Sequence, residues 1–227
     1  MPNLPKRVLL ALTSHGSLGD TGKPTGYYVP EAAHPWEVFR KAGYEVSFVS
    51  VKGGQPPATG YNAEDEVQRE FLEDPEVKKA LADTPTADSL NPADYAAVYF
   101  VGGHGTMWDF PDAADLAALA RDIYEAGGVV AAVCHGPAGL VNLKLSDGRY
   151  LVEGKEFASF TNEEEDAVNL SGVVPFLLQS KLEERGGIHV KKPKFESCVV
   201  VSERLVTGQN PASASGVAEE TVKLLAD

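Results

Sequence analysis

Cysteine is scarce in this sequence, whose 227 residues include only Cys134 and Cys198. Small domains that depend on disulfides carry many more cysteines, so we exclude a disulfide framework. Two cysteines outside such a framework are typical of a protein in a reducing compartment, and we expect this protein to be cytoplasmic.

Basic residues are also few. The sequence has 20 lysines and arginines against 33 aspartates and glutamates, which gives a formal net charge of -13 at pH 7. Phosphate backbones and anionic membranes are bound by positively charged surfaces, which a chain this acidic does not offer. We therefore expect neither a nucleic acid nor a membrane as a partner.

Long hydrophobic runs are absent as well. No stretch of 18 apolar residues exists, and a membrane-spanning helix needs about that length. Near the N-terminus the only apolar run extends from Val8 to Leu12, which is too short for the hydrophobic region of a secretory signal. With 43% hydrophobic and 23% charged residues, the composition is that of an ordinary globular protein.

Short apolar segments alternate with segments of helical periodicity along the chain. The expected strands are 7–13, 45–51, 96–101, 129–133, 188–191, 198–202 and 205–208, and the longer helices are 30–41, 112–126, 173–182 and 210–225. This alternation predicts an α/β fold, a doubly wound, mostly parallel sheet with helices on both faces, as in a flavodoxin-like sandwich. We expect the whole chain, 1–227, to form a single domain.

The segment at about 53–90 is more polar and acidic than the rest. It has too few large apolar residues for a core of its own, so we expect a small lid insertion with short helices at 64–72 and 75–82. Farther along the chain, 150–153 and 156–160 are expected to pair as a hairpin.

The segment 127–139, GGVVAAVCHGPAG, carries the strongest functional signal. Its apolar run is typical of a strand buried on both faces, and Gly136 and Pro137 suit the start of a helix. Cys134 would then lie in a sharp strand-to-helix turn, the geometry of a nucleophile elbow with sulfur in place of oxygen. The helix N-terminus would lower the thiol pKa, and His135 is an adjacent base.

A buried structural thiol is the alternative interpretation of Cys134, because free cysteines are often buried. That interpretation leaves the adjacent His135 and the glycine and proline that follow it unexplained. We therefore favour a functional thiol here, and we interpret Cys198 as a small hydrophobic residue in a strand.

A second glycine-rich turn follows the expected strand at 96–101. Its sequence, Gly102-Gly103-His104-Gly105, matches neither a dinucleotide-binding fingerprint nor a phosphate-binding loop. Glycines at the carboxyl end of a strand let backbone N–H groups approach a ligand, as an oxyanion hole requires. The alternative is a tight turn with no further role, and His104, like His15 and His34, taken alone indicates only a local hydrogen bond.

Glu31 follows a long loop, 14–28, at the start of the first expected helix. The simplest interpretation is a surface carboxylate that complements the helix dipole. However, the junction of a first strand and helix lies at the same edge of a parallel sheet as Cys134. That position favours a role for Glu31 in the site.

An acidic run occupies residues 163–166, after Thr161 and Asn162, either of which is a suitable helix cap. Acids at a helix start usually complement the dipole from a solvated face, which is how we interpret Glu163, Glu164 and Asp166. Because a helix turns one face toward a pocket, at most one or two of the four acids can reach it.

Five blocks occur in order along the chain: GYYVPEAAHPW, VGGHGTMWDF, AVCHGPAGL, FTNEEE and LVTGQNPASA. Together they resemble the ThiJ/PfpI superfamily, which is related to class I glutamine amidotransferases. Within it the chain is similar to the glyoxalase-III-like branch, which also contains stress chaperones. The resemblance extends from about Arg7 to the C-terminus.

The resemblance implies roles for several residues. Cys134 would be the nucleophile, and His135 would be its base. Glu31 would hydrogen-bond the sulfur or relay protons. Backbone amides of Gly103 and His135 would form the oxyanion hole.

The third member of the triad would be Glu165, five residues after the phenylalanine of the FTNEEE block. Glu163 and Glu164 stay open as alternatives if the register of that turn is shifted. Some bacterial relatives carry a metal site near the first helix, but its histidine is replaced here by an apolar residue near Val38. We therefore expect no metal and no cofactor, and the resemblance implies a homodimer.

The implied activity is that of a glutathione-independent glyoxalase, a lyase of the D-lactate dehydratase type. It would convert methylglyoxal, a small reactive aldehyde, and water to D-lactate as part of a stress response. A cysteine hydrolase or deglycase would use the same nucleophile and is the main alternative. A holdase chaperone and a redox-sensing thiol are further alternatives.

Overall fold

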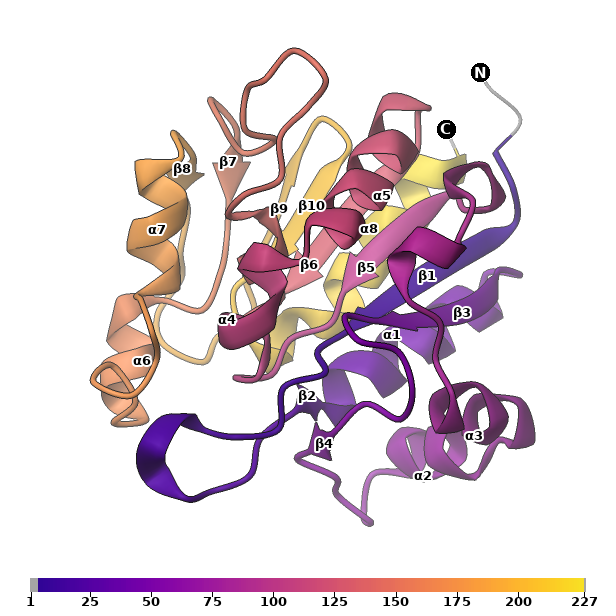
Figure 1. The fold of residues 1–227 in the computed structure, drawn as a ribbon, viewed down its shortest axis with the longest axis horizontal. Helices are drawn as coiled ribbons and strands as arrows, with labels where there is room; N and C mark the ends of the chain where they lie inside the picture. Colours follow the sequence, from indigo (N-terminus) through magenta and orange to yellow (C-terminus); the bar gives the residue numbers. More distant parts are fainter. Residues whose placement is uncertain (1–3, 227) are drawn as a thin grey trace.

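A six-stranded sheet forms the centre of the computed structural model, which describes residues 4–226 (Figure 1). The strand order is β3-β1-β5-β6-β10-β9, and only β9 runs antiparallel to its neighbour. The bounds are β1 (Arg7–Leu12), β3 (Glu45–Ser50), β5 (Ala97–Phe100), β6 (Val129–Val133), β9 (Val199–Ser202) and β10 (Leu205–Gly208). The predicted mostly parallel α/β fold is confirmed.

The sheet separates two hydrophobic layers, because successive strand residues point to opposite faces. On β1, Leu10 belongs to one layer and Leu9 to the other. The first layer is covered by α1 (Val29–Lys41) and α8 (Ala214–Ala226), and the second by α5 (Ala114–Glu125). Helices therefore lie on both faces, as the sequence pattern predicts.

The order of connections across the sheet reverses beside β1, at the carboxyl ends of the central strands. From β1 the chain passes through α1 to β3 on one side, and it then returns to β5 on the other side. In doubly wound sheets ligands bind outside the carboxyl ends of the strands, near such a reversal of strand order.

The segment at 53–90 contains α2 (Glu66–Glu73) and α3 (Pro75–Ala82), close to their expected positions. Phe71 of α2 is buried and packs edge-on against Trp36 and Phe48, so these helices extend the core beside α1 and β3. A short strand, β4 (Ala58–Thr59), pairs in parallel with β2 (Tyr27–Tyr28).

Two local expectations are wrong. The hairpin does not form, because residues 151–154 are turns and β7 (Glu156–Phe157) pairs in parallel with β8 (Ile188–His189). The helix expected from 173 begins later, as α7 (Leu178–Glu184), because Pro175 lacks an N–H and restricts the residue before it.

The other helices are short. They are α4 (Thr106–Asp109) and α6 (Asn162–Ala167), with 3-10 helices η1 (Gly19–Thr21), η2 (Ala87–Ser89), η3 (Pro92–Asp94), η4 (Phe110–Asp112), η5 (Gly136–Leu140) and η6 (Pro211–Ser213). None of the helices within residues 4–226 is long and apolar enough to cross a membrane.

Candidate active site

Cys134 occupies a sharp turn directly after β6. Its φ is +59°, a left-handed backbone conformation that residues other than glycine seldom adopt. The backbone is held on both sides, since Cys134 N–H donates to Gly208 O at 2.9 Å and Cys134 O accepts from Phe160 N–H at 2.8 Å. The turn also needs Gly136, because a Cβ there would lie 2.1 Å from Phe100 O.

A chain of hydrogen bonds leads away from the thiol. Cys134 Sγ lies 3.4 Å from His135 Nδ1, and His135 Nε2 lies 2.6 Å from Glu165 Oε2. The side chains of His135 and Glu165 are almost completely buried. The structure thus brings together a thiol, an imidazole and a carboxylate in the order that a cysteine nucleophile, its base and an orienting acid require.

The three glutamates of the acidic run have different surroundings. Glu163 is exposed and pairs with Lys191 at 2.5 Å, so it points away from the thiol. Glu164 is buried, and its carboxylate faces the backbone and amides of other segments. Glu165 is the member of this run that reaches His135.

The expectation that Glu164 lies on a solvated face is wrong. Its Oε2 accepts from the N–H of Thr161, which caps α6, and its Oε1 accepts from Phe195 N–H and from the Gln209 and Asn210 side chains. Glu164 therefore ties the start of α6 to segments 31 to 46 residues away and holds the turn that presents Glu165.

Replacing Glu164 with alanine is expected to lower the free energy of unfolding by about 3–5 kcal/mol, because several buried donors would lose their acceptor. Denaturant unfolding measures the effect. Glu163→Ala is the matched control, since it removes one exposed ion pair and should leave the free energy of unfolding nearly unchanged. Equal effects of the two substitutions would contradict this account of Glu164.

Glu31 lies in the first turn of α1 and is completely buried. A Cβ on Gly102 would lie 2.1 Å from Glu31 Oε2 and 3.0 Å from Cys134 Cβ, which shows how closely the carboxyl group, the glycine and the thiol approach. Within residues 4–226 neither carboxyl oxygen meets a donor at hydrogen-bond geometry. Glu31 is therefore not the surface carboxylate of the simplest interpretation.

Burial and neighbouring side chains set the pKa values of these groups, and burial has the largest effect on Glu31 and His135. It raises the pKa of Glu31 to about 8. Burial also lowers the pKa of His135 to about 4, so its imidazole is neutral near pH 7. The pKa of Glu165 falls to about 2 because His135 and His104 outweigh the effect of burial.

The expected lowering of the thiol pKa is wrong. Burial, and then the nearby Glu31 carboxylate, raise the pKa of Cys134 well above its ordinary value, and the His135 N–H only partly compensates. The helix that follows is the five-residue η5, and its N-terminus does not outweigh burial. A proton must therefore leave the thiol as it reacts, and the unprotonated Nδ1 of His135 is placed to accept it.

The turn after β5 supplies backbone N–H groups at the same edge of the sheet. The φ of Gly103 is +115°, and a Cβ there would lie 2.3 Å from Gly26 O, so only glycine fits. Among the described residues no acceptor takes the Gly103 N–H. It lines the same pocket as Cys134 and is available to a ligand oxygen.

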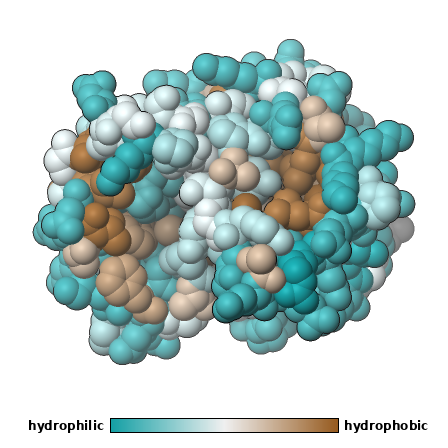
Figure 2. Space-filling view, turned by 90° about the horizontal axis from the view of Figure 1, so that it is seen from below, coloured by the Kyte–Doolittle hydropathy of each residue, from teal (hydrophilic) through white to brown (hydrophobic). Residues whose placement is uncertain are grey.

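A pocket of about 230 Å³ surrounds the thiol. Its lining is mostly apolar and includes no lysine or arginine; the residues are Tyr28, Glu31, Thr59, Gly103, His104, Cys134, His135, Phe160, Val168, Phe195 and Pro211. Tyr28 of β2, Thr59 of β4 and Val168, which follows α6, belong to this lining, and these three elements lie at the lower side of Figure 1. Seen from that side, the molecule is largely hydrophilic, with hydrophobic surface gathered in two separate areas (Figure 2).

One residue of the site was missed by sequence reasoning. His104 Nε2 lies 2.8 Å from Glu165 Oε1, so its hydrogen bond reaches 61 residues along the chain and is not local. By contrast, His15 bonds the backbone of Ser17, and His34 bonds Asp65 outside the pocket. The signal available in the sequence is the position of His104 in the glycine-rich turn that follows β5, at the same edge of the sheet as Cys134.

Within residues 4–226, His104, His135 and Glu165 form a set of side chains that could hold a metal ion. One ligand atom from each lies within 4.8 Å of the other two. Both imidazoles, however, already hydrogen-bond the carboxylate, which accounts for the arrangement without an ion.

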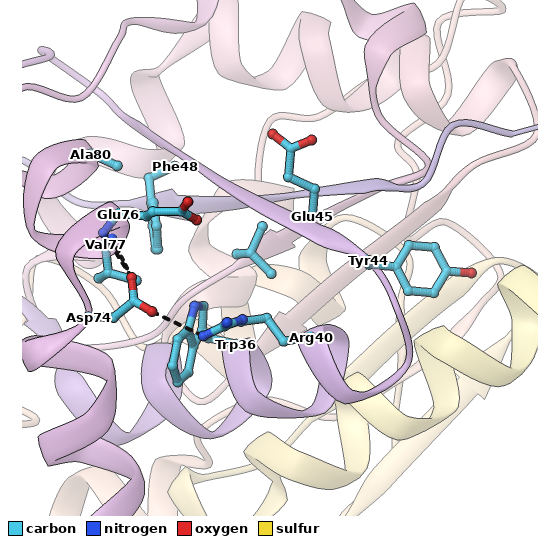
Figure 3. A pocket seen from close by; sticks show the side chains of 10 residues that line it. Trp36, Arg40, Tyr44, Glu45, Phe48, Asp74, Glu76, Val77 and Ala80 are labelled. Carbon is cyan, nitrogen blue, oxygen red and sulfur yellow. Dashed lines mark hydrogen bonds and ion pairs between the residues drawn. The ribbon is translucent and has the colours of Figure 1, made fainter.

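Another cavity, of about 100 Å³, lies between α1, β3 and α3 (Figure 3). There Arg40 pairs with Asp74 at 3.1 Å and lies over the ring of Trp36 at 4.7 Å. Its lining includes neither cysteine nor histidine, and its arginine is already paired. It offers no nucleophile comparable to the one beside β6.

Similarity to known proteins extends over nearly the whole chain. Residues 26–224 match a family model described as the DJ-1/PfpI family. Glyoxalase 3 of Candida albicans is 37% identical over 233 residues, which cover 95% of this chain and 97% of that protein. Glutathione-independent glyoxalase HSP31 of Saccharomyces cerevisiae is 38% identical over 240 residues, with coverage of 97% and 98%.

Solved structures show the same similarity over nearly the whole chain. The crystal structure of glyoxalase III from Candida albicans has a TM-score of 0.88 at 35% identity, covering 96% of each chain. The 24 kDa rapid encystment protein of Francisella tularensis has a TM-score of 0.93 at 35% identity, covering 96% of this chain and 98% of its own.

Proposed function

The chain belongs to the DJ-1/PfpI family, as its motifs predicted, and from this premise we propose that it is a glutathione-independent glyoxalase. It would convert methylglyoxal and water to D-lactate. The observation that carries the proposal is the buried pair of Cys134 and Glu31 beside the neutral imidazole of His135. The chain's own thiol would do what the thiol of glutathione does in a glutathione-dependent reaction.

The first step is addition to the aldehyde. Cys134 Sγ bonds to the aldehyde carbon while its proton passes to His135 Nδ1, and Glu165 stabilises the resulting imidazolium. The carbonyl oxygen becomes an alkoxide that the N–H groups of Gly103 and His135 would stabilise. Return of the proton to that oxygen gives a hemithioacetal.

The second step moves a proton between the two substrate carbons. Glu31 is suited to carry it, because a pKa of about 8 lets one carboxyl group act as both base and acid near neutral pH. Removal of the proton from the first carbon gives an enediol, and protonation of the second carbon gives a lactoyl thioester. Water then hydrolyses the thioester, which releases lactate and restores the thiol.

The pocket suits a substrate of this class. Its mostly apolar lining without lysine or arginine favours a small uncharged carbonyl compound over a charged one. The names of the relatives, glyoxalase 3 and glutathione-independent glyoxalase, agree with that preference.

A substrate panel tests the proposal against its alternatives. Wild-type protein is incubated without any added thiol with methylglyoxal, a glycated amine or a peptide amide, and loss of each compound is followed. We expect methylglyoxal to be consumed with the highest kcat/KM. Faster turnover of the amine or amide would favour the deglycase or hydrolase, and suppression of client aggregation without turnover would favour the holdase.

We propose three further properties of the chain. It is a single domain with an insertion at about 53–90, because Phe71 of that segment shares the core with Trp36 of α1. It is cytoplasmic, because both cysteines are free thiols. It is a homodimer, since closed two-fold dimers are the commonest soluble assemblies, and light scattering during size-exclusion chromatography measures its mass.

A further inference from the structure

His104 forms the second hydrogen bond to the carboxylate of Glu165. It lies in the turn between β5 and α4, with Nε2 2.8 Å from Oε1, while His135 Nε2 lies 2.6 Å from Oε2. The two imidazole rings are close, with centroids 4.0 Å apart at 41°. Both oxygens of Glu165 are therefore occupied, each by a different histidine.

This arrangement determines where the protons are. An ionised carboxylate only accepts hydrogen bonds, so both histidines must present an Nε2–H to Glu165. A neutral His135 with its proton on Nε2 has an unprotonated Nδ1, which is the atom that faces Cys134 Sγ at 3.4 Å. The tautomer needed for accepting the thiol proton therefore depends on the orientation of Glu165.

Within the described part of the chain, the side chains that hydrogen-bond the Glu165 carboxylate are His104 and His135. With His135 alone, the carboxylate could rotate about its last bond and present either oxygen. With His104 on Oε1, the plane is fixed and Oε2 stays directed at His135. The side chain of His104 is 21% exposed, so its bond is only partly screened by water.

We propose that His104 is a positioning residue, which acts through Glu165 to keep the Nδ1 of His135 unprotonated and directed at the Cys134 thiol. The kinetic part of this inference rests on the proposed glyoxalase activity. The structural part, the tautomer of His135, is independent of the substrate.

Two substitutions separate the hydrogen bond from the packing of the ring. His104→Phe keeps an aromatic ring against His135 and Phe160 but removes the donor, and His104→Gln keeps an N–H donor. For His104→Phe we expect kcat for methylglyoxal to fall roughly 10- to 100-fold with KM within about twofold, as for loss of a hydrogen bond to a charged group. His104→Gln should recover a large part of kcat.

His34→Phe is the matched control, because His34 also bonds a carboxylate, Asp65 at 2.8 Å, but does not line the pocket. It should leave kcat unchanged. Two results would overturn the proposal: a kcat of His104→Phe within twofold of wild type, or equal losses of kcat in His104→Phe and His104→Gln. Either result would show that the hydrogen bond does not position the triad.

Nitrogen-15 NMR of the imidazoles tests the structural part in the free protein. In the wild type we expect both His104 and His135 to carry their proton on Nε2. In His104→Phe, His135 should show a mixture of Nε2–H and Nδ1–H forms. A His104 without a proton on Nε2 in the wild type would overturn the proposal, even if methylglyoxal proves not to be the substrate or the variant does not fold.

Discussion

Replacing Cys134 with alanine is expected to lower kcat for methylglyoxal by about 10⁴-fold or more, because no covalent adduct can form. The fold should remain. Alanine keeps the Cβ, so the cost of the left-handed conformation at φ +59° does not change, and we expect the free energy of unfolding to change by about 1 kcal/mol. Steady-state kinetics and denaturant unfolding measure the two effects.

Cys198→Ala is the control for this prediction. That thiol is also buried, but it belongs to a small separate cluster beside β9 and does not line the pocket. Its removal should leave kcat within about twofold of wild type. Turnover by Cys134→Ala above about one hundredth of the wild-type rate would exclude Cys134 as the nucleophile.

Replacing Glu31 with glutamine is expected to lower kcat by roughly 10²- to 10⁴-fold, because an amide cannot carry a proton between the substrate carbons. The variant should still form the hemithioacetal, since Cys134 and His135 are intact. Mass spectrometry of the protein with methylglyoxal would then show an adduct at Cys134 that turns over slowly. A kcat of Glu31→Gln equal to that of the wild type would show that another group moves the proton.

The same substitution should change how stability depends on pH. Burial raises the pKa of Glu31 from 4.5 to about 8, so the native state holds a proton that the unfolded chain has lost. The stability that Glu31 contributes is full below about pH 4.5 and is lost as pH rises to about 8. Glu31→Gln does not titrate, so it should gain stability relative to wild type between pH 5 and 8.

Denaturant unfolding at pH 5, 7 and 9 measures this difference. The free energies of unfolding of the two proteins should be most alike at pH 5, and the variant should be the more stable protein at pH 9. Parallel pH dependence in wild type and variant would mean that Glu31 is already ionised in the native protein near neutral pH, and would contradict the raised pKa of Glu31.

Much of the sheet could be predicted because its signals are local. β6 at Val129–Val133 and β10 at Leu205–Gly208 have their expected bounds, since each is an apolar run that ends at a polar or glycine-containing turn. The pairing of β7 with β8 could not be predicted, because it joins residues about 30 positions apart and replaces the expected hairpin between 150–153 and 156–160.

In the site, too, features set by local sequence could be predicted and contacts between distant segments could not. The turn at Cys134 and the start of α1 at Glu31 could be placed at one edge of the sheet from local patterns and the order of elements. The surroundings of Glu164 and His104 could not, because their partners come from distant segments. The thiol pKa was misjudged for a related reason, since burial and Glu31 act on it only in the folded chain.

The most direct test of the central claim is the stereochemistry of the product. Wild-type protein, free of glutathione and other thiols, is incubated with methylglyoxal, and both lactate enantiomers are quantified. We predict D-lactate in an amount equal to the methylglyoxal consumed, and none from Cys134→Ala. Consumption without lactate, or equal amounts of both enantiomers, would contradict a glyoxalase reaction in which a positioned group protonates the second carbon.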